Sequence, residues 1–235
     1  METNKYNYTR RKPMKEKVFL FVGATGLIGS HVLEKLNKKN RKIFLLSRLI
    51  GETNYSNNIK NIHFNFDIPY TDIDLPYCDH LFICIGRRLK VWELLYIRNK
   101  DRKDHYKIEH DYVLKIAKKA KELGASNISI ISAVGAKQNS FNFYLKTKGQ
   151  IEESLKNLGF ENISILRPGH IIVNKSRSKS GTVVWLIDFI FNLLNPFLLG
   201  FLKKYRGISL DKISEFMASH EPKGTKIFYY DDFIK

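Results

Sequence analysis

Cysteine is scarce in this chain of 235 residues, and so are the features that accompany secretion. The two cysteines, Cys78 and Cys84, lie in or beside apolar runs, which predicts buried free thiols rather than a disulfide or a metal site. Residues 1–16 are rich in basic side chains and lack the apolar core of a signal peptide. We therefore expect a flexible basic N-terminal arm and a cytoplasmic protein.

Acidic residues are also few. The chain has 23 of them against 40 lysines and arginines, which gives a formal net charge of +17 at pH 7. Much of the excess is spread along helical faces, as at Lys115, Lys118, Lys119 and Lys121, and this is typical of a solvated surface. Attraction of anionic ligands, nucleic acid or lipid headgroups is the alternative. Because no standard nucleic-acid-binding signature is present, we expect no specific nucleic-acid partner.

An uninterrupted apolar segment of membrane-spanning length is absent as well. The nearest one, residues 183–202, is broken by Asp188, Asn192, Asn195 and Pro196. We expect a packed amphipathic helix and turn there, with docking at a membrane surface as the alternative. No pattern in the sequence indicates an oligomeric state.

Short apolar runs alternate with helical patterns over the first two thirds of the chain. Strands are expected at 18–23, 42–47, 62–67, 81–86, 127–132 and 163–168. Helices are expected at 27–39, 106–124 and 142–159. This alternation predicts an α/β fold, namely a Rossmann-type doubly wound parallel sheet with a small C-terminal helical lobe. The first, fourth and fifth strands should be central, because they are almost continuously apolar.

A glycine-rich turn connects the first expected strand to the first helix. It comprises Gly23, Ala24, Thr25, Gly26, Leu27, Ile28 and Gly29. Its glycines let the backbone approach a pyrophosphate, and the helix N-terminus supplies amide donors and a favourable dipole. This order predicts a dinucleotide site, because a merely flexible turn would not need all three glycines.

This site suggests how the chain is divided. We expect an arm at 1–16, a dinucleotide-binding Rossmann domain at 17–170 and a small substrate or lid region at 171–235, packed on the same domain.

The acid that usually follows the second strand of an NAD site is missing. That strand ends in Ser47 and Arg48, and no acidic residue follows before Glu52. A carboxylate at this point accepts from the ribose 2′-hydroxyl of NAD, whereas a hydroxyl followed by a guanidinium suits a 2′-phosphate. The sequence therefore favours NADP(H) over NAD(H), with an ordinary exposed charge as the alternative for Arg48.

Other residues border the expected cofactor site. Asp67, followed by Ile68, closes the third expected strand; it suits either a hydrogen bond to the adenine amino group or the start of a turn. Gly86 ends the fourth strand, where the chain passes close to the cofactor. For Arg87 and Arg88, which come next, simple exposure is favoured over contact with a phosphate or an anionic substrate.

Tyr144 and Lys148 share one stripe of their predicted helix, at about 100° per residue. The stripe also holds Ile151 and Leu155, and a lysine among apolar anchors is uncommon unless it snorkels or has a task. Glu152 falls outside the stripe and is expected to be solvated. A lysine beside a tyrosine favours the phenolate and moves the phenol pKa towards the range of acid–base catalysis.

Ser132 ends the fifth expected strand and adds a hydroxyl that suits the orientation of a carbonyl or alcohol. Taken alone, a strand-end or capping serine would be the preferred interpretation. With Tyr144 and Lys148 following it, and a nucleotide turn preceding it, the three residues form a specific catalytic pattern.

These motifs together resemble those of the atypical or extended short-chain dehydrogenases/reductases. The resemblance rests on GATGLIG, on Ser132 within IISAVGA, on Tyr144-x-x-x-Lys148 and on LRPG at 166–169, and it covers roughly residues 17–210. Within that superfamily, SAVGAKQNSFNFYLKTKGQIEESL followed by ISILRPG is similar to the TIP30 (HIV Tat-interacting protein 2) branch of NAD(P)H-binding oxidoreductase-like proteins.

The resemblance implies roles for individual residues. Tyr144 would donate or accept a proton, Lys148 would bind the ribose and lower the phenol pKa, and Ser132 would polarise the reacting oxygen. Pro168 and Gly169 would line the nicotinamide. Hydride would pass between the cofactor, NADP(H), and a carbonyl or alcohol substrate.

One departure from the superfamily concerns its usual catalytic asparagine. Residues 106–122 contain no asparagine, and Glu109 lies near the expected place. The resemblance therefore leaves two functions open, an NADP(H)-dependent oxidoreductase or an NAD(P)H-binding regulatory, assembly or redox-sensing protein with little or no catalysis. A sugar-nucleotide epimerase is disfavoured, because the region after Gly169 leaves little room for a nucleotide-sugar.

Overall fold

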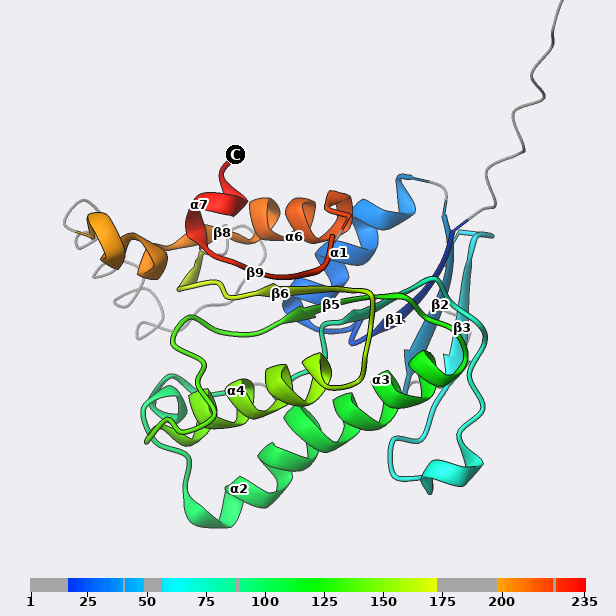
Figure 1. Ribbon diagram of the computed structural model, residues 1–235, viewed down its shortest axis with the longest axis horizontal. Helices are drawn as coiled ribbons and strands as arrows, with labels where there is room; N and C mark the ends of the chain where they lie inside the picture. Colours follow the sequence, from blue (N-terminus) through cyan, green and yellow to red (C-terminus); the bar gives the residue numbers. More distant parts are fainter. Residues whose placement is uncertain (1–16, 40, 49–55, 88, 173–197, 222) are drawn as a thin grey trace, which may run out of the picture.

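The computed structural model describes residues 17–39, 41–48, 56–87, 89–172, 198–221 and 223–235 (Figure 1). Among them, seven parallel strands form one sheet in the order β3-β2-β1-β4-β5-β6-β9. These strands are β1 (Val18–Val22), β2 (Lys42–Ser47), β3 (Ile59–His63), β4 (His80–Ile83), β5 (Asn127–Ile131), β6 (Asn162–Leu166) and β9 (Thr225–Phe228). The strand order reverses between β1 and β4, the place where doubly wound sheets bind ligands. The expected Rossmann-type fold is confirmed.

Helices cover both faces of the sheet (Figure 1). One face carries α1 (Leu27–Asn37) and α6 (Leu210–Ser219). The other carries α2 (Asn99–Tyr106), the π turn η3 (Lys107–Asp111), α3 (Tyr112–Glu122) and α4 (Phe143–Lys156). The short elements are η1 (Tyr70–Asp72), η2 (Val91–Leu94), β7 (Ile171–Ile172), η6 (Gly200–Tyr205), β8 (Ile208–Ser209) and α7 (Tyr230–Phe233).

The core consists of one apolar cluster on each face of the sheet. On the α3–α4 side, Ile116, Ile151 and Leu155 are fully buried against the strands. On the α1–α6 side, Leu36 and Ile213 are fully buried. The predicted centrality of the first, fourth and fifth strands is confirmed, because β1, β4 and β5 lie in the middle of the sheet. The predicted free cysteines are confirmed too: Cys78 is buried and Cys84 half-buried.

The third strand lies earlier than predicted. We expected it at 62–67, whereas β3 ends at His63. The alternating phenylalanines that suggested a strand serve another purpose, since Phe64 and Phe66 are buried after the strand has ended and pack edge to face on each other. The expected helix at 106–124 also begins earlier, at Asn99, and is interrupted by the π turn.

Part of the region expected to form the small C-terminal lobe on this domain belongs to the main layers. Strand β9 pairs in parallel with β6 and extends the sheet, and α6 packs beside α1. Of the strands in the described residues, β7 and β8 pair apart from it, as a small second sheet. The expected N-terminal arm, Arg88 and most of the apolar stretch at 183–202 lie outside the described residues. Within the part of the chain that is described, no helix has both the length and the apolarity needed to cross a bilayer.

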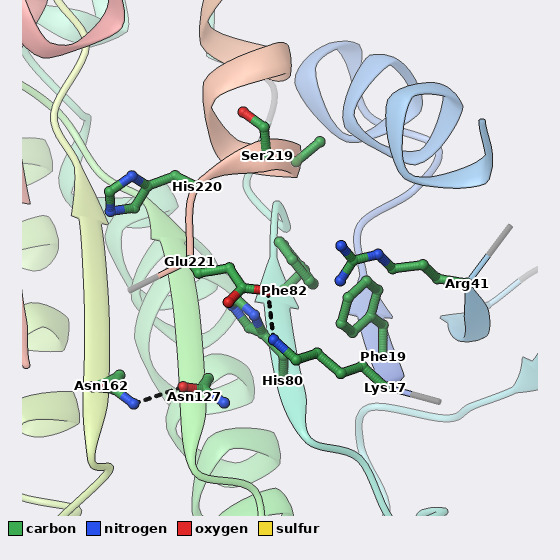
Figure 2. Close-up of a pocket in the computed structure, with 11 residues that line it drawn as sticks. Lys17, Phe19, Arg41, His80, Phe82, Asn127, Asn162, Ser219, His220 and Glu221 are labelled. Atoms are coloured by element: carbon green, nitrogen blue, oxygen red, sulfur yellow. Dashed lines mark hydrogen bonds and ion pairs between the residues drawn. The ribbon is translucent and has the colours of Figure 1, made fainter. Parts of the chain in front are cut away.

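His80 begins β4 and borders a cavity of about 240 Å³ at the amino ends of the strands (Figure 2). Its ring stacks on Phe82 with 4.0 Å between centroids, and its Nε2 lies 2.8 Å from Ser129 Oγ. Burial, assisted by the charges of Lys17 and Arg41, lowers the pKa of His80 from its ordinary 6.5 to about 3. The folded protein therefore holds this imidazole neutral in mild acid.

The buried neutral His80 predicts an acid-sensitive fold. Below pH 6.5 the unfolded chain protonates this histidine, whereas the folded chain does so only near pH 3. The free energy of unfolding should thus fall by about 1.4 kcal/mol per pH unit in this window from His80 alone. Urea denaturation at several pH values should show that the free energy of unfolding of His80→Gln depends less steeply on pH, by the contribution of one proton. The exposed His63→Gln is the control, and an equal slope in His80→Gln and the wild type would contradict the prediction.

Candidate functional site

The glycine-rich turn forms a tight cradle between β1 and α1. Gly23 has φ +91°, and a Cβ there would lie 2.5 Å from the carbonyl carbon of Cys84. A Cβ on Gly29 would lie 2.0 Å from the carbonyl oxygen of Gly23. Gly26 is the residue that caps α1. Only glycine therefore fits at positions 23 and 29, and the bare backbone beside a helix N-terminus fits a pyrophosphate.

A cavity of about 1250 Å³ opens at this cradle. It is larger than typical small-molecule sites of about 300–1000 Å³, as an extended ligand such as a dinucleotide requires. The predicted cofactor residues that line it are Gly23, Thr25, Gly26, Leu27, Ile28, Arg48 and Gly86. Arg87 also lines it, as do Ile171, Ile172 and Leu210 from the C-terminal part of the chain. The residues present therefore fit a dinucleotide.

The residues predicted for the adenosine end differ in their surroundings. Arg48 lines the cavity just beyond β2, as a contact to a 2′-phosphate requires. Asp67 instead accepts a hydrogen bond from the Tyr112 hydroxyl at 2.6 Å and pairs with Lys107 Nζ at 2.6 Å. The bond from Lys107, then that from Tyr112, lowers the pKa of Asp67. Asp67 is thus anchored to the helix side, and its contact with adenine stays a prediction.

Ser47, Ala24, Gly29 and Ile68 do not border the cavity themselves. The Ser47 carbonyl accepts from the Phe64 amide at 2.8 Å, and the Ile68 carbonyl accepts from Lys115 Nζ at 2.8 Å. Their cofactor contacts remain predictions.

Lys148 is held in an ion pair within the protein. Asn142 caps α4 by accepting from the Leu145 amide, and the helix carries Tyr144 and Lys148 one turn apart. Lys148 Nζ lies 2.7 Å from Glu109 Oε2 and 3.2 Å from the carbonyl oxygen of Ile131. Lys148 is 6% exposed and Glu109 is 3% exposed. The prediction that Lys148 lies in the buried stripe is confirmed.

The pKa of Tyr144 is raised in spite of the neighbouring ammonium. Burial raises the pKa of Tyr144; Lys148 acts in the opposite direction, and Glu109 adds to the increase. For Lys148, burial lowers the pKa, but Glu109 and the neighbouring groups outweigh it and the pKa is raised. The expected shift of the phenol pKa towards neutrality is therefore wrong for the protein without its cofactor, because burial and Glu109 together exceed the effect of the ammonium.

Glu109 links the end of β4 to α4. Its Oε1 accepts from the Arg87 amide at 2.8 Å, while Oε2 faces Lys148. A Cβ on Gly86 would lie 2.9 Å from Glu109 Oε1, so the missing side chain at Gly86 makes room for this carboxylate. Gly86 and Arg87 line the large cavity. Glu109 therefore connects the Tyr144–Lys148 pair to residues of the cavity wall.

Ser132 has a buried partner away from Tyr144. Its hydroxyl donates to Glu152 Oε1, and Glu152 lies on α4 two turns beyond Tyr144. Arg167 donates to both oxygens of Glu152, from Nε at 2.9 Å and from Nη2, and its Nη1 donates to the Tyr229 hydroxyl at 3.0 Å. Ser132 is thus not brought together with Tyr144 by any described hydrogen bond, and its catalytic role stays a prediction.

Pro168 and Gly169 follow β6 and pack on the chain. The Pro168 carbonyl accepts from the Val134 amide at 3.0 Å, and a Cβ on Gly169 would lie 2.8 Å from the carbonyl oxygens of Tyr205 and Arg206. Neither residue is among those that line the cavity, so their contact with the nicotinamide also stays a prediction.

Sequence reasoning missed the Glu152–Arg167 pair. Glu152 was expected to be solvated, and this is wrong, because it is 0% exposed and holds Ser132 and Arg167. Its partner comes from the end of β6, so no local spacing reveals the pair. The available signal was Arg167 itself, a single charge at the end of the apolar run ISIL.

No family model matches this chain. Among curated proteins, rat HTATIP2 is 28% identical over 192 residues, which cover 77% of this chain and 73% of that protein. Candida glabrata FMP52, named as mitochondrial, is 25% identical over 186 residues, 72% of this chain and 70% of that protein. Saccharomyces cerevisiae FMP52, also named as mitochondrial, is 43% identical over 74 residues, 32% of this chain and of that protein.

Solved structures share the fold. The UDP-glucose 4-epimerase of Thermotoga maritima, crystallised with UDP-glucose, has a TM-score of 0.60 at 15% identity and covers 90% of this chain and 76% of its own. Human epimerase family protein SDR39U1, crystallised with NADPH, has a TM-score of 0.56 at 14% identity, with 90% and 74% covered. This chain is thus similar to HTATIP2 over most of its length, and it shares the fold of these solved structures.

The resemblance inferred from the motifs is thereby confirmed, and the chain has the NAD(P)-binding fold of these proteins. Solved neighbours carry either NAD or NADPH, so the comparisons leave the choice of dinucleotide open. The expected cytoplasmic location is wrong, because the FMP52 relatives are named as mitochondrial.

The buried Glu152–Arg167 pair should stabilise the fold. Replacing Glu152 by Gln leaves the Arg167 guanidinium without a charge partner, which should lower the free energy of unfolding by about 3 kcal/mol. Urea denaturation measures this change. The matched control is Glu153→Gln on the same helix, which removes a surface pair with Lys156 and should change stability by less than about 0.5 kcal/mol. Equal effects of the two substitutions would contradict the prediction.

Proposed function

We propose that this protein is an NADP(H)-dependent oxidoreductase of the short-chain dehydrogenase/reductase type, acting on a carbonyl or alcohol substrate. The observation that carries the proposal is the pair of half-buried Tyr144 and buried Lys148, which is connected to the nucleotide cavity through Glu109, Gly86 and Arg87. A tyrosine and a lysine one helical turn apart are placed to share one substrate-facing side of α4.

The chain's own residues suit proton transfer during reduction. The bound cofactor would supply the hydride. Gly23, Gly26 and the α1 N-terminus would hold the pyrophosphate. The Tyr144 hydroxyl would give its proton to the carbonyl oxygen as that oxygen gains negative charge, and Lys148 would bind the ribose. Because the pKa of Tyr144 is raised, the phenol is protonated at neutral pH, which favours the reductive direction.

Arg48 supports the preference for NADP(H). It lines the cavity just after β2, where the sequence has Ser47 and Arg48 in place of the carboxylate that NAD sites use for the ribose 2′-hydroxyl. A guanidinium offers planar paired donors to a phosphate.

A second candidate function is an NAD(P)H-binding regulatory, assembly or redox-sensing protein with little catalysis. Two contacts favour it: the Lys148 ammonium is held by Glu109, and the Ser132 hydroxyl donates to Glu152. A site whose polar groups are already satisfied internally is able to retain a dinucleotide without turning over a substrate.

The preference for NADPH is tested with Arg48→Ala. Loss of a charged contact to the 2′-phosphate should weaken NADPH binding about tenfold to a hundredfold, while NADH binding stays unchanged. Fluorescence titration with both dinucleotides gives the two dissociation constants. Lys42→Ala, at the opposite end of β2, is the control. An equal loss for NADH and NADPH would contradict the 2′-phosphate role.

Catalysis is tested by NADPH oxidation with a panel of aldehydes and ketones. Tyr144→Phe should lower kcat by about a hundredfold or more, because the proton donor is lost, and should leave NADPH binding unchanged. Tyr96→Phe, at an exposed position, is the control. NADPH binding without turnover of any panel member would favour the second candidate. Failure to bind either dinucleotide would contradict both.

A further inference from the structure

Glu109 is buried, and each of its two carboxylate oxygens contacts a different group: one accepts a hydrogen bond and the other forms an ion pair. Its Oε1 accepts from the Arg87 amide in the segment that follows β4, and its Oε2 lies 2.7 Å from the Lys148 ammonium on α4. The space that it occupies exists because Gly86 has no side chain. Such a carboxylate cannot swing away from Lys148 without leaving a buried charge unpaired.

The backbone around Glu109 is unusual as well. Glu109 lies in the π turn Lys107–Asp111, between α2 and α3. A π turn inserts one extra residue into a helix and frequently marks a functional site. The turn presents Glu109 to α4, and the pairs His105/Glu109 and Tyr144/Lys148, each spaced by four residues, meet across the two helices.

The other titratable groups near the pair are neutral or paired. The His105 ring is 0% exposed and lies 6.0 Å from the Tyr144 ring, and burial lowers its pKa, so it carries no charge at neutral pH. Arg87 pairs with Glu93 at 3.1 Å. Glu152, which also acts on Lys148, pairs with Arg167, and the Cys84 thiol stays protonated because burial raises its pKa to about 12.

We propose that Glu109 is a positioning residue of the Tyr144–Lys148 pair: it holds the Lys148 ammonium in place and balances its charge, so that Tyr144 keeps its proton until a substrate receives it. As a catalytic device this rests on the proposed oxidoreductase function. As an electrostatic arrangement it holds for the protein without cofactor, and it is testable there.

The charges of Lys148 and Glu109 act on the Tyr144 phenol in opposite directions. Lys148 alone would stabilise the phenolate, and the negative charge of Glu109 opposes it. Removing that charge while keeping the shape, as in Glu109→Gln, should lower the pKa of Tyr144 by about one unit. Glu109→Asp, which keeps the charge, should return the pKa towards the wild-type value.

The experiment is an NMR titration of the protein without cofactor, with 13C at Cζ of tyrosine and Tyr144→Phe to assign the signal. We expect the downward shift in Glu109→Gln, its reversal in Glu109→Asp and no shift in Glu153→Gln, whose carboxylate lies at the surface. A Tyr144 pKa in Glu109→Gln that is unchanged or higher would overturn the proposal. Because the readout is the phenol and not turnover, this result stands apart from any failure of the proposed oxidoreductase activity.

If Glu109→Gln does not fold, a second pair of variants tests the same effect of Glu109 on Tyr144. Lys148→Met and the double variant Glu109→Gln/Lys148→Met differ only in Glu109, and the double variant buries no unpaired charge. The Tyr144 pKa should be lower in the double variant than in Lys148→Met, and equal values would overturn the proposal. Where turnover is found, the limb of the kcat–pH profile that reports Tyr144 should move in Glu109→Gln by the same amount as the NMR titration.

Discussion

Two buried ion pairs fasten α4 to the carboxyl ends of the strands, and the candidate site depends on both. Lys148 pairs with Glu109, which is itself anchored to the end of β4, and Glu152 pairs with Arg167 at the end of β6. Charges that are removed from water must be matched, so these pairs fix the rotation of α4 about its axis as apolar packing alone would not. The position of Tyr144 on α4 therefore depends on these two ion pairs.

The same pairs set the chemical character of the site. Lys148, Arg87 and Arg167 each pair with a carboxylate, so these described pairs add little net charge around Tyr144. Tyr144 therefore experiences burial more strongly than it experiences an ammonium, and its pKa rises. A protonated phenol is what the proposed reduction requires of Tyr144, so the same arrangement would serve both stability and the proposed chemistry.

Local patterns in the sequence predicted the parts of the structure that local physics determines. The apolar runs gave β1, β4 and β5, and the order of strand, glycines and helix gave the cradle at Gly23 and Gly29, where a Cβ meets backbone. The helical stripe gave the burial of Lys148. The errors concern tertiary partners: Glu152 is buried because Arg167 arrives from β6, and Phe64 and Phe66 pack into the core beyond the end of β3.

Glu109, which lies near the place expected for the asparagine, is part of the π turn. A regular helix through residues 99–122 would run past α4 with its own periodicity, whereas the extra residue of the π turn changes which side chains face α4 in that segment. In this chain the side chain that results is a carboxylate in direct contact with Lys148. A neutral amide there would leave the ammonium unbalanced and would favour the phenolate. Glu109 therefore acts on Tyr144 in the same direction as burial, which is the larger cause of the raised pKa of this phenol.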